Sequence, residues 1–386
     1  DSYTRAGRVS KSVEVPTIPN SKVGSQLTTT TLTAGFKPVV ADRIKYPTGE
    51  ETGNVTLRSE DLGPGLFMAL VEPKSLLSLP PRTHTWKRPR PRRLTSEQLK
   101  LMQKWEVAGH LGFIEATKVS SHEMSDVVGL HKSTSHDRQI VDRRGPNGAE
   151  DIVEGDAAYL PAGPLFCELH LEPGQNLLLA TSDLEQCYMQ VSASAERACS
   201  TPVGLPETKA VLMKWFSSAA VLKGGPDTLF HITFGGLGQG DHAAVQIVQT
   251  AHRALLSTAG LLGDTEVRNR FRFPRSDLIS AVCVDDLGIL WKYLNCNDFR
   301  SLAACDRQDK VATQQALDAY PQYGWRIAED KLQLDSNDGV LLGAGIEGVV
   351  GRIGVPRCRR ITLAEICLRL GVHGFATAHL LDSVTG

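Results

Sequence analysis

The sequence lacks the features of a membrane-bound, secreted or zinc-stabilised protein. None of its apolar stretches reaches the roughly 20 residues that a membrane-spanning helix needs, and its first residues do not form a signal peptide. Its eight cysteines are scattered, with no Cys-x-x-Cys pair and no zinc-finger spacing of Cys and His. These absences predict an intracellular protein, cytoplasmic or nuclear and not secreted, with reduced thiols and no membrane partner.

The chain also has almost no net charge, because 42 Lys and Arg residues face 43 Asp and Glu residues. This balance argues against indiscriminate binding to nucleic acid. The basic residues are nevertheless clustered, first in the segment Arg82–Arg93 and again from Arg352 to Arg360. Each cluster is either a solvated charged segment or a local surface for a phosphate backbone, and the two interpretations stay open.

The length of 386 residues and the hydrophobic content of 41% predict two or three subdomains with a substantial core. Because the chain begins with Asp1 rather than Met, it is expected to be a fragment or a processed piece. Ser, Thr, Gly and Pro dominate the first 60 residues, and prolines exclude a helix from residues 80–93. Residues 1–95 are therefore predicted to be a loosely ordered N-terminal extension and a basic linker, with a short helix within 66–79.

Helical and strand-like patterns alternate in the rest of the chain. A helix capped by Thr95 or Ser96 is predicted first, and a long helix is predicted to begin at Asp241. The other predicted elements are strands within 119–144, 171–180, 325–334 and 340–355, and helices at 210–222, 313–320 and 361–381.

Two adjacent aspartates, Asp285 and Asp286, separate the apolar runs Ala281–Val284 and Leu287–Trp291. Two such runs joined by two turn-tolerant residues predict a β-hairpin with both carboxylates at its tip. Like charges so close together repel one another, and a bound cation would reverse that cost. The alternative is a solvated turn, since Asp is a common turn residue.

A third carboxylate, Asp183, follows the apolar run Leu177–Ala180 and so lies at the end of a predicted strand. Strand ends are usual positions for functional side chains. Three carboxylates on two strands predict a site for two Mg²⁺ ions that would support in-line phosphoryl transfer.

The order of these features resembles the palm of reverse transcriptases. A carboxylate at a strand end is followed by the glycine-rich loop 235–240 with its long helix, by the double-Asp hairpin and by glycine-punctuated strands. The resemblance covers roughly Leu101 to Pro356 and is greatest for the retrotransposon type. The loop sequence GQGDHAAVQ is similar to that of elements abundant in dinoflagellate genomes.

The resemblance implies an α+β fold, namely a right-hand polymerase with fingers and palm and a truncated thumb. The palm would be a ferredoxin-like antiparallel sheet plus helices. The implied boundaries are 96–175 for the fingers, 176–356 for the palm with an inserted fingers segment near 203–234, and 357–386 for the start of the thumb.

By the same resemblance, Asp183 matches the first metal-binding aspartate of the family, and Asp285 and Asp286 match its terminal pair. The implied cofactor is two Mg²⁺ ions, with Mn²⁺ as a substitute, and the carbonyl of Leu184 would assist. Lys331 matches a lysine that acts as a general acid on the leaving pyrophosphate, although a solvated lysine is the alternative.

The resemblance also implies a nucleotide site. Lys132 and Arg138 would hold the triphosphate, and Tyr188 would exclude a ribose 2′-OH by its bulk. In the loop, Gln239 and Gly240 would approach the incoming nucleotide. The alternatives are a surface hairpin with ordinary charges, a half-buried tyrosine and a loop that caps a helix.

Several positions depart from the family pattern or are expected to be structural. Gly238 replaces the usual Pro of the loop, and Cys283 stands where many members have Tyr. The expected structural pins of the fingers are Asp142, Arg144 and Asn147.

Taken together, these features predict an RNA-directed DNA polymerase that acts on an RNA or DNA template with a primer and on deoxynucleoside triphosphates. The first alternative is a degenerate, inactive relic of a retroelement that at most binds nucleic acid. The second is an RNA-templated RNA polymerase, whose palm shares the double-Asp hairpin.

Overall fold

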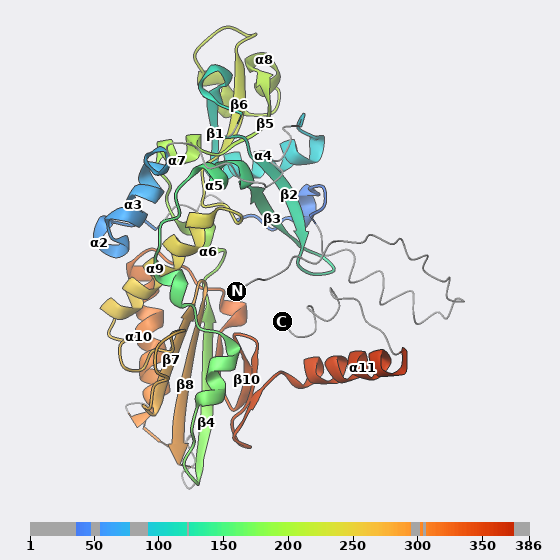
Figure 1. Ribbon diagram of the computed structural model, residues 1–386. Coiled ribbons are helices and arrows are strands. Elements are labelled where there is room, and N and C mark those ends of the chain that lie inside the picture. The colour runs from blue at the N-terminus through green and yellow to red at the C-terminus, as the bar shows by residue number, and fades with distance from the viewer. Residues whose placement is uncertain are drawn as a thin grey trace, which may run out of the picture.

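The computed structural model of the chain describes residues 36–47, 55–77, 92–121, 123–294, 302–303 and 306–373. These residues form helices and antiparallel sheets, so the α+β composition expected from the sequence is present. In Figure 1 the elements form two groups, one around strands β1, β5 and β6 and the other around β4, β7 and β8.

The second group is built on a four-stranded sheet with the order β7-β8-β4-β9. Its long strands, β4 and β8, pair antiparallel over their full lengths, and β7 pairs antiparallel with β8. The strands of the sheet are β4 (Gln175–Asp183), β7 (Leu278–Cys283), β8 (Asp286–Leu294) and β9 (Gln333–Ser336).

The predicted hairpin is present between β7 and β8, but its turn lies one residue earlier than expected. Cys283 pairs with Asp286, so the two turn residues are Val284 and Asp285. Asp286 is the first residue of β8 and not part of the turn. Its place in the strand fixes the direction of its side chain, because successive side chains of a strand alternate between the two faces.

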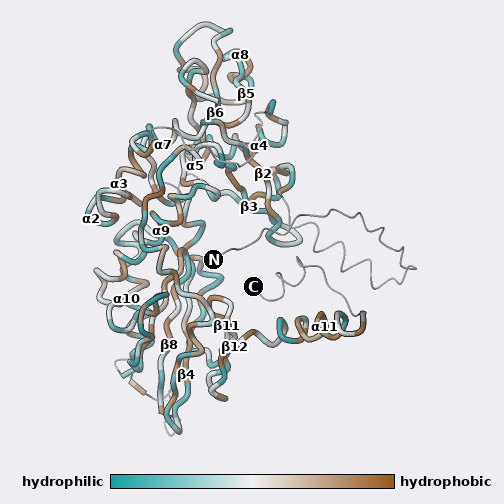
Figure 2. Tube along the Cα trace, viewed as in Figure 1, coloured by the Kyte–Doolittle hydropathy of each residue, from teal (hydrophilic) through white to brown (hydrophobic). Residues whose placement is uncertain are grey.

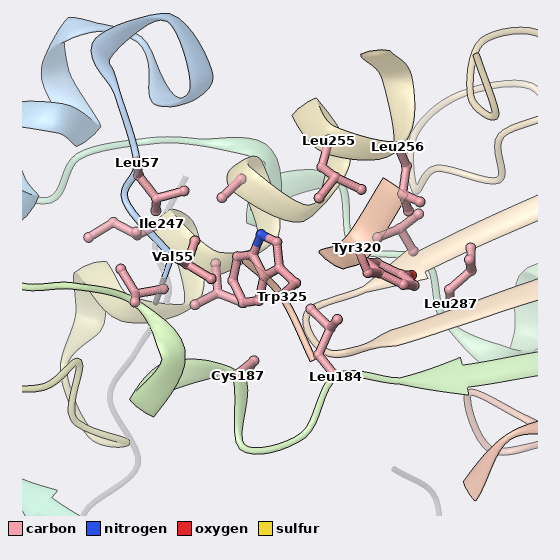
Figure 3. Packing of buried hydrophobic residues seen from close by; sticks show 14 of the residues in the cluster. Val55, Leu57, Leu184, Cys187, Ile247, Leu255, Leu256, Leu287, Tyr320 and Trp325 are labelled. Atoms are coloured by element: carbon pink, nitrogen blue, oxygen red, sulfur yellow. The ribbon is translucent and has the colours of Figure 1, made fainter. Parts of the chain in front are cut away.

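The two faces of this sheet are covered differently. Ala180 and Ile289 pack against helices α9 (His242–Thr258) and α10 (Gln308–Gln322), in the core cluster that Figure 3 shows from close by. Leu179 and Leu290 lie in a separate cluster on the opposite face. That cluster includes residues of a small sheet made of β10 (Asp338–Leu341), β11 (Ala344–Glu347) and β12 (Arg352–Gly354). The apolar stretches of β4 and β8 are visible in Figure 2.

Part of the N-terminal extension is packed, which corrects the expectation of loose order for residues 55–77. Helices α2 (Ser59–Leu62) and α3 (Pro64–Val71) bury Leu62, Leu66 and Leu70 in the same cluster as α9. The apolar residues of this segment lie on the sides of the helices that meet α9. The predicted basic linker at 80–93 lies outside the described residues except for its last two positions.

The first group of elements contains the capped helix that the sequence predicts. Helix α4 (Ser96–Val107) begins after Thr95, whose side chain accepts a hydrogen bond from Gln98 N–H while the Gln98 side chain accepts one from Thr95 N–H. The strands of this group form a hairpin of β2 and β3 and a sheet of order β1-β6-β5. Their bounds are β1 (Leu111–Glu115), β2 (Asp126–His131), β3 (Asp137–Asp142), β5 (Pro202–Thr208) and β6 (Leu229–Phe234).

Several helices differ from their predicted extent. The range 210–222 was expected to be one helix but holds only α8 (Lys209–Leu212) and a 3-10 turn at Ser217–Val221. The final helix, α11 (Arg357–His373), extends away from the other described elements in Figure 1. The remaining short helices are α5 (Arg144–Ala149), α6 (Cys187–Gln190) and α7 (Ala195–Cys199). Among the described residues, no helix has the length and apolar character needed to cross a membrane.

Acid should destabilise the fold through His110, which is only 5% exposed. Its Nδ1 lies 2.7 Å from the hydroxyl of Tyr46, and burial lowers its pKa from 6.5 to about 4. The unfolded chain therefore takes up the proton at a higher pH than the folded protein. This contribution to stability is complete above pH 6.5 and is lost as the pH falls towards 4.

We expect this loss to reach about 3 kcal/mol in the free energy of unfolding. Urea unfolding at a series of pH values should show a smaller acid-induced loss for His110→Gln than for the parent protein. The matched control is His136→Gln, at an exposed histidine, which should follow the parent. An unchanged pH dependence in His110→Gln would show that other groups cause the acid sensitivity.

Candidate active site

Two of the three predicted acids face each other across the central sheet. Asp183, the last residue of β4, is the direct antiparallel partner of Asp286, the first residue of β8. Side chains at directly opposite positions have Cβ atoms about 5 Å apart. The third acid, Asp285, is in the adjoining turn, and its carbonyl accepts a hydrogen bond of 2.8 Å from Leu184 N–H. The structure therefore brings together acids that lie about a hundred positions apart in the sequence.

The alternation of side chains places the Asp183–Asp286 pair on the sheet face opposite α9 and α10. Counting by twos from Leu179 leads to Asp183, and counting by twos from Leu290 leads back to Asp286. Gly288 lies between Asp286 and Leu290 on this face. A side chain at this position would clash with that of Leu341. The paired acids thus lie at the ends of two hydrogen-bonded strands, β4 and β8, at the edge of a packed core.

Burial and neighbouring charges raise the pKa of two of the acids, Asp285 and Asp286. Burial raises the pKa of Asp286 to about 7, and the charges of Asp285 and Asp183 add to this effect. The pKa of Asp285 is also raised, first by burial and then by the charge of Asp183. Carboxylates gathered this closely form a site that a cation would stabilise.

Lys331 supplies part of the positive charge. Its Nζ lies 2.7 Å from Oδ1 of Asp183, and the same segment donates a backbone hydrogen bond from Ala328 N–H to the Asp183 carbonyl. Burial lowers the pKa of Lys331, but the hydrogen bond to Asp183 and the charges of the three acids outweigh burial, so its pKa is raised. The lysine predicted as a general acid is therefore protonated and in contact with the site.

The donor atoms of the site suit a hard divalent cation. The three carboxylates offer only oxygen ligands, as Mg²⁺ and Mn²⁺ prefer. Within the described part of the chain, however, no three Asp, Glu, His or Cys side chains are close enough to hold a metal ion as they stand. The ammonium group of Lys331 occupies one oxygen of Asp183, so metal binding there requires that contact to loosen.

In metal-free buffer, Asp286→Asn should stabilise the protein at high pH. The folded-state pKa of Asp286, about 7, lies above its ordinary value of 3.8, so ionisation disfavours the folded state. This destabilisation is absent below pH 4, grows as the pH rises, and is complete above pH 7. Allowing for solvent screening, we expect the variant to be more stable than the parent by about 2 kcal/mol at alkaline pH.

Thermal unfolding at acid and alkaline pH, with and without Mg²⁺, measures this effect. The gain should disappear well below pH 4, where Asp286 is protonated in both states. Added Mg²⁺ should raise the melting temperature of the parent more than that of the variant. Equal stabilities of parent and variant at both pH values would contradict the proposed repulsion.

Two of the predicted nucleotide-binding residues lie near the acids. Tyr188, in α6, is half-buried, and burial raises its pKa, with further contributions from the neighbouring thiol of Cys187 and from Asp285. Arg138 is exposed on β3, and its charge lowers the pKa of both Tyr188 and Asp285. The third residue, Lys132, is exposed just beyond β2, where its N–H donates to the His136 carbonyl. None of the described contacts joins Lys132 to the acids.

The glycine-rich loop packs closely against strand β3. Val141 N–H donates to the Gln239 carbonyl at 2.8 Å, and a side chain at Gly240 would clash with the Val141 carbonyl. Gly240 also has a φ of +113°, which favours glycine. The close approach that the loop requires is therefore to the β2–β3 hairpin. Contact of Gln239 and Gly240 with a nucleotide remains a prediction.

The expected structural pins of this region make structural contacts. Asn147 donates from Nδ2 to the Gly240 carbonyl at 2.7 Å, which ties α5 to the loop. Arg144 binds Asp142 through two hydrogen bonds from its guanidinium group. Asp241 caps α9, since its Oδ1 accepts from Ala243 N–H.

Sequence analysis missed a buried ionic cluster next to this cap. Both Arg143 and Arg197 contact Oδ2 of Asp241, and Arg143 also donates to Glu150 at 2.8 Å. All four side chains are no more than 5% exposed. Buried arginines of this kind join elements that are far apart in the sequence. The one local feature of the sequence that pointed to the cluster was the helix-capping position of Asp241.

Sequence analysis also missed three polar residues behind the acid turn. Gln249 and His252 lie among the mostly apolar buried residues of α9, and Tyr320 lies on α10. Two polar residues in an otherwise apolar stripe were a usable signal.

No protein-family model and no curated protein matches this chain. Among solved structures, one similar chain is a foamy viral protease-reverse transcriptase dRH in complex with double-stranded DNA. It has a TM-score of 0.46 and 12% identity over 75% of this chain and 41% of that chain. Another is a foamy viral protease-reverse transcriptase with double-stranded DNA, with a TM-score of 0.44 and 14% identity over 80% of this chain and 52% of that one.

This chain thus spans about half, or less, of the length of those viral chains. At such identities and scores, the likeness establishes neither a family nor an activity.

Proposed function

We propose that the chain is the catalytic core of an RNA-directed DNA polymerase of a retroelement. The observation that supports this proposal is the pairing of Asp183 with Asp286, beside Asp285, at one edge of the central sheet. The order of the motifs in the sequence supports it independently. The foamy viral structures are not needed for either argument.

The proposed reaction is transfer of a deoxynucleotide to a primer 3′-OH. Asp183, Asp285 and the Leu184 carbonyl would hold two divalent cations, and Asp286 would assist as a weaker ligand or a support. When bound, such ions supply activation of the 3′-OH and neutralise charge on the triphosphate.

The other side chains of the site would bind and orient the nucleotide. Arg138, whose charge lowers the pKa of Asp285, would meet phosphate charge there, and Lys132 would have to approach from the end of its hairpin. Lys331 keeps a proton on Nζ at neutral pH, because its pKa is raised, and would give it to the leaving pyrophosphate. The ring of Tyr188 would exclude a 2′-OH.

Part of the positive charge of the second basic cluster, Arg352 to Arg360, is neutralised within the protein, so less of it would be available to nucleic acid. Arg352 and Arg360 both form ion pairs with Glu347, at 3.3 and 3.2 Å, which reduces the net charge offered to a phosphate backbone.

Primer extension on RNA and DNA templates, with dNTPs or NTPs, tests the proposal. Use of dNTPs with an RNA template would support it, and equal use of both nucleotide types would favour an RNA-templated RNA polymerase. Binding of primer and template without extension by freshly purified protein would favour the inactive relic. A mock purification from cells that lack the protein, carried out in parallel, controls for contaminating polymerases.

A further inference from the structure

The residue that precedes the acids in the hairpin turn has an unfavourable backbone conformation. Val284 has a φ of +58°, in the left-handed region. A β-branched side chain is seldom found there, because it crowds the backbone. Such a conformation persists only where the surrounding structure holds it. The position matters because the next residue is Asp285.

The side-chain amide of Gln249 holds this turn from one side. Its Oε1 accepts a hydrogen bond of 2.6 Å from Val284 N–H, and its Nε2 donates one of 3.0 Å to the Val282 carbonyl. Gln249 is only 1% exposed, so water does not compete for these groups. One amide therefore satisfies both a donor of the turn and an acceptor of β7.

His252, one turn further along α9, holds the other polar group of the same residue. Its Nδ1 lies 2.8 Å from the Val284 carbonyl and its Nε2 lies 2.9 Å from the Tyr320 hydroxyl. A carbonyl can only accept, so Nδ1 carries the hydrogen, and in the neutral ring Nε2 accepts from Tyr320. His252 is fully buried.

The chain of hydrogen bonds continues to the other acid-bearing strand. The Tyr320 hydroxyl is also hydrogen-bonded to the side chain of Ser182, which immediately precedes Asp183 in β4. Figure 3 shows Tyr320 among Leu255, Leu256 and Leu287, so its ring is fixed by apolar packing while its hydroxyl links the polar groups. Helices α9 and α10 thus contact both acid-bearing segments from behind the sheet.

We infer that Gln249, His252 and Tyr320 are positioning residues, which hold Val284 in its left-handed conformation and thereby fix Asp285 and Asp286 relative to Asp183. The kinetic consequence rests on the proposed polymerase function, but the geometric one does not. The ordinary alternative is that these groups only satisfy one another's hydrogen bonds in a core. The convergence of these contacts argues against that alternative, because side chains of one helix bind both the N–H and the carbonyl of the strained residue Val284.

The variant Gln249→Met tests this inference. Methionine fills a similar volume but neither accepts from Val284 N–H nor donates to β7. The matched control is Gln246→Met, on the same helix, which removes a hydrogen bond of 3.2 Å to Ala157 N–H away from the turn. Hydrogen exchange of the Val284 amide should become much faster in Gln249→Met and should stay slow in Gln246→Met.

Kinetics of single-nucleotide incorporation give a second readout. We expect Gln249→Met to lower kcat by about 10²-fold, as for a misplacement of catalytic groups by about 1 Å, with little change in the KM for dNTP. Tyr320→Phe, which removes only the hydroxyl, should lower kcat less. Gln246→Met should keep the parent kcat even if its melting temperature falls by a similar amount.

A rescue variant separates positioning from general stability. Glycine adopts a positive φ without strain. Adding Val284→Gly to Gln249→Met should therefore recover part of the lost kcat, measured well below the melting temperature. Unchanged Val284 exchange in Gln249→Met would overturn the inference, and so would an unchanged kcat. If the parent protein shows no incorporation but Val284 exchange still depends on Gln249, the proposed function fails and the positioning of the turn stands.

Discussion

Replacing Asp183 by Asn is expected to reduce primer extension by at least about 10³-fold, because the proposed function makes this carboxylate a metal ligand, and losing it would cost several kcal/mol in the transition state. Asn keeps the size of the side chain but loses its charge. The loss should appear in kcat at saturating dNTP, with either Mg²⁺ or Mn²⁺. Primer and template affinity should change little, since most of that binding is to the phosphate backbone elsewhere.

The matched control is Asp277→Asn, at an exposed aspartate just before β7 and therefore at the far end of the hairpin from the acid turn. This variant should extend primers at the parent rate. Thermal unfolding of both variants checks that the fold is intact. Extension by Asp183→Asn within tenfold of the parent would show that Asp183 is not a metal ligand, and the proposed chemistry would then fail.

The convergence of the acids was predictable because it depends on local patterns. Leu177–Ala180 and the two runs around Asp285 are apolar and short, so each predicts a buried strand. An acid that ends such a strand is therefore expected to lie at the edge of the sheet. The position of the turn was harder, because Val284 has no sequence signal for a positive φ and the expected turn residues were the two acids.

The residues that sequence analysis missed all act over long distances in the chain. Arg143 meets Asp241 across 98 positions, and Gln249 meets Val284 across 35. Neither pairing leaves a periodic pattern, since each depends on how separate elements pack. A short helix within 66–79 was predicted and overlaps α3, but helix α2 and the packing of both helices against α9 were not predicted, because that burial also joins distant parts of the chain.

Replacing Tyr188 by Ala is expected to increase the use of NTPs relative to dNTPs by about 10²-fold, which corresponds to about 3 kcal/mol of lost discrimination. Tyr188 lies close enough to Asp285 for that carboxylate to raise its pKa, so its ring is near the acids where the proposed function requires the sugar of the nucleotide. Exclusion by bulk needs no hydrogen bond, and Tyr188→Phe should therefore keep the preference for dNTPs.

The measurement is single-nucleotide incorporation of matched dNTP and NTP pairs, compared as kcat/KM. Tyr188 also packs against the core cluster beside α9, so Tyr188→Ala will lose some stability, and the ratio of the two substrates removes that common effect. An equal loss of activity with both substrates would identify Tyr188 as a packing residue only. A loss of discrimination in Tyr188→Phe as well would assign the selection to its hydroxyl, because the ring is the feature that the two side chains share.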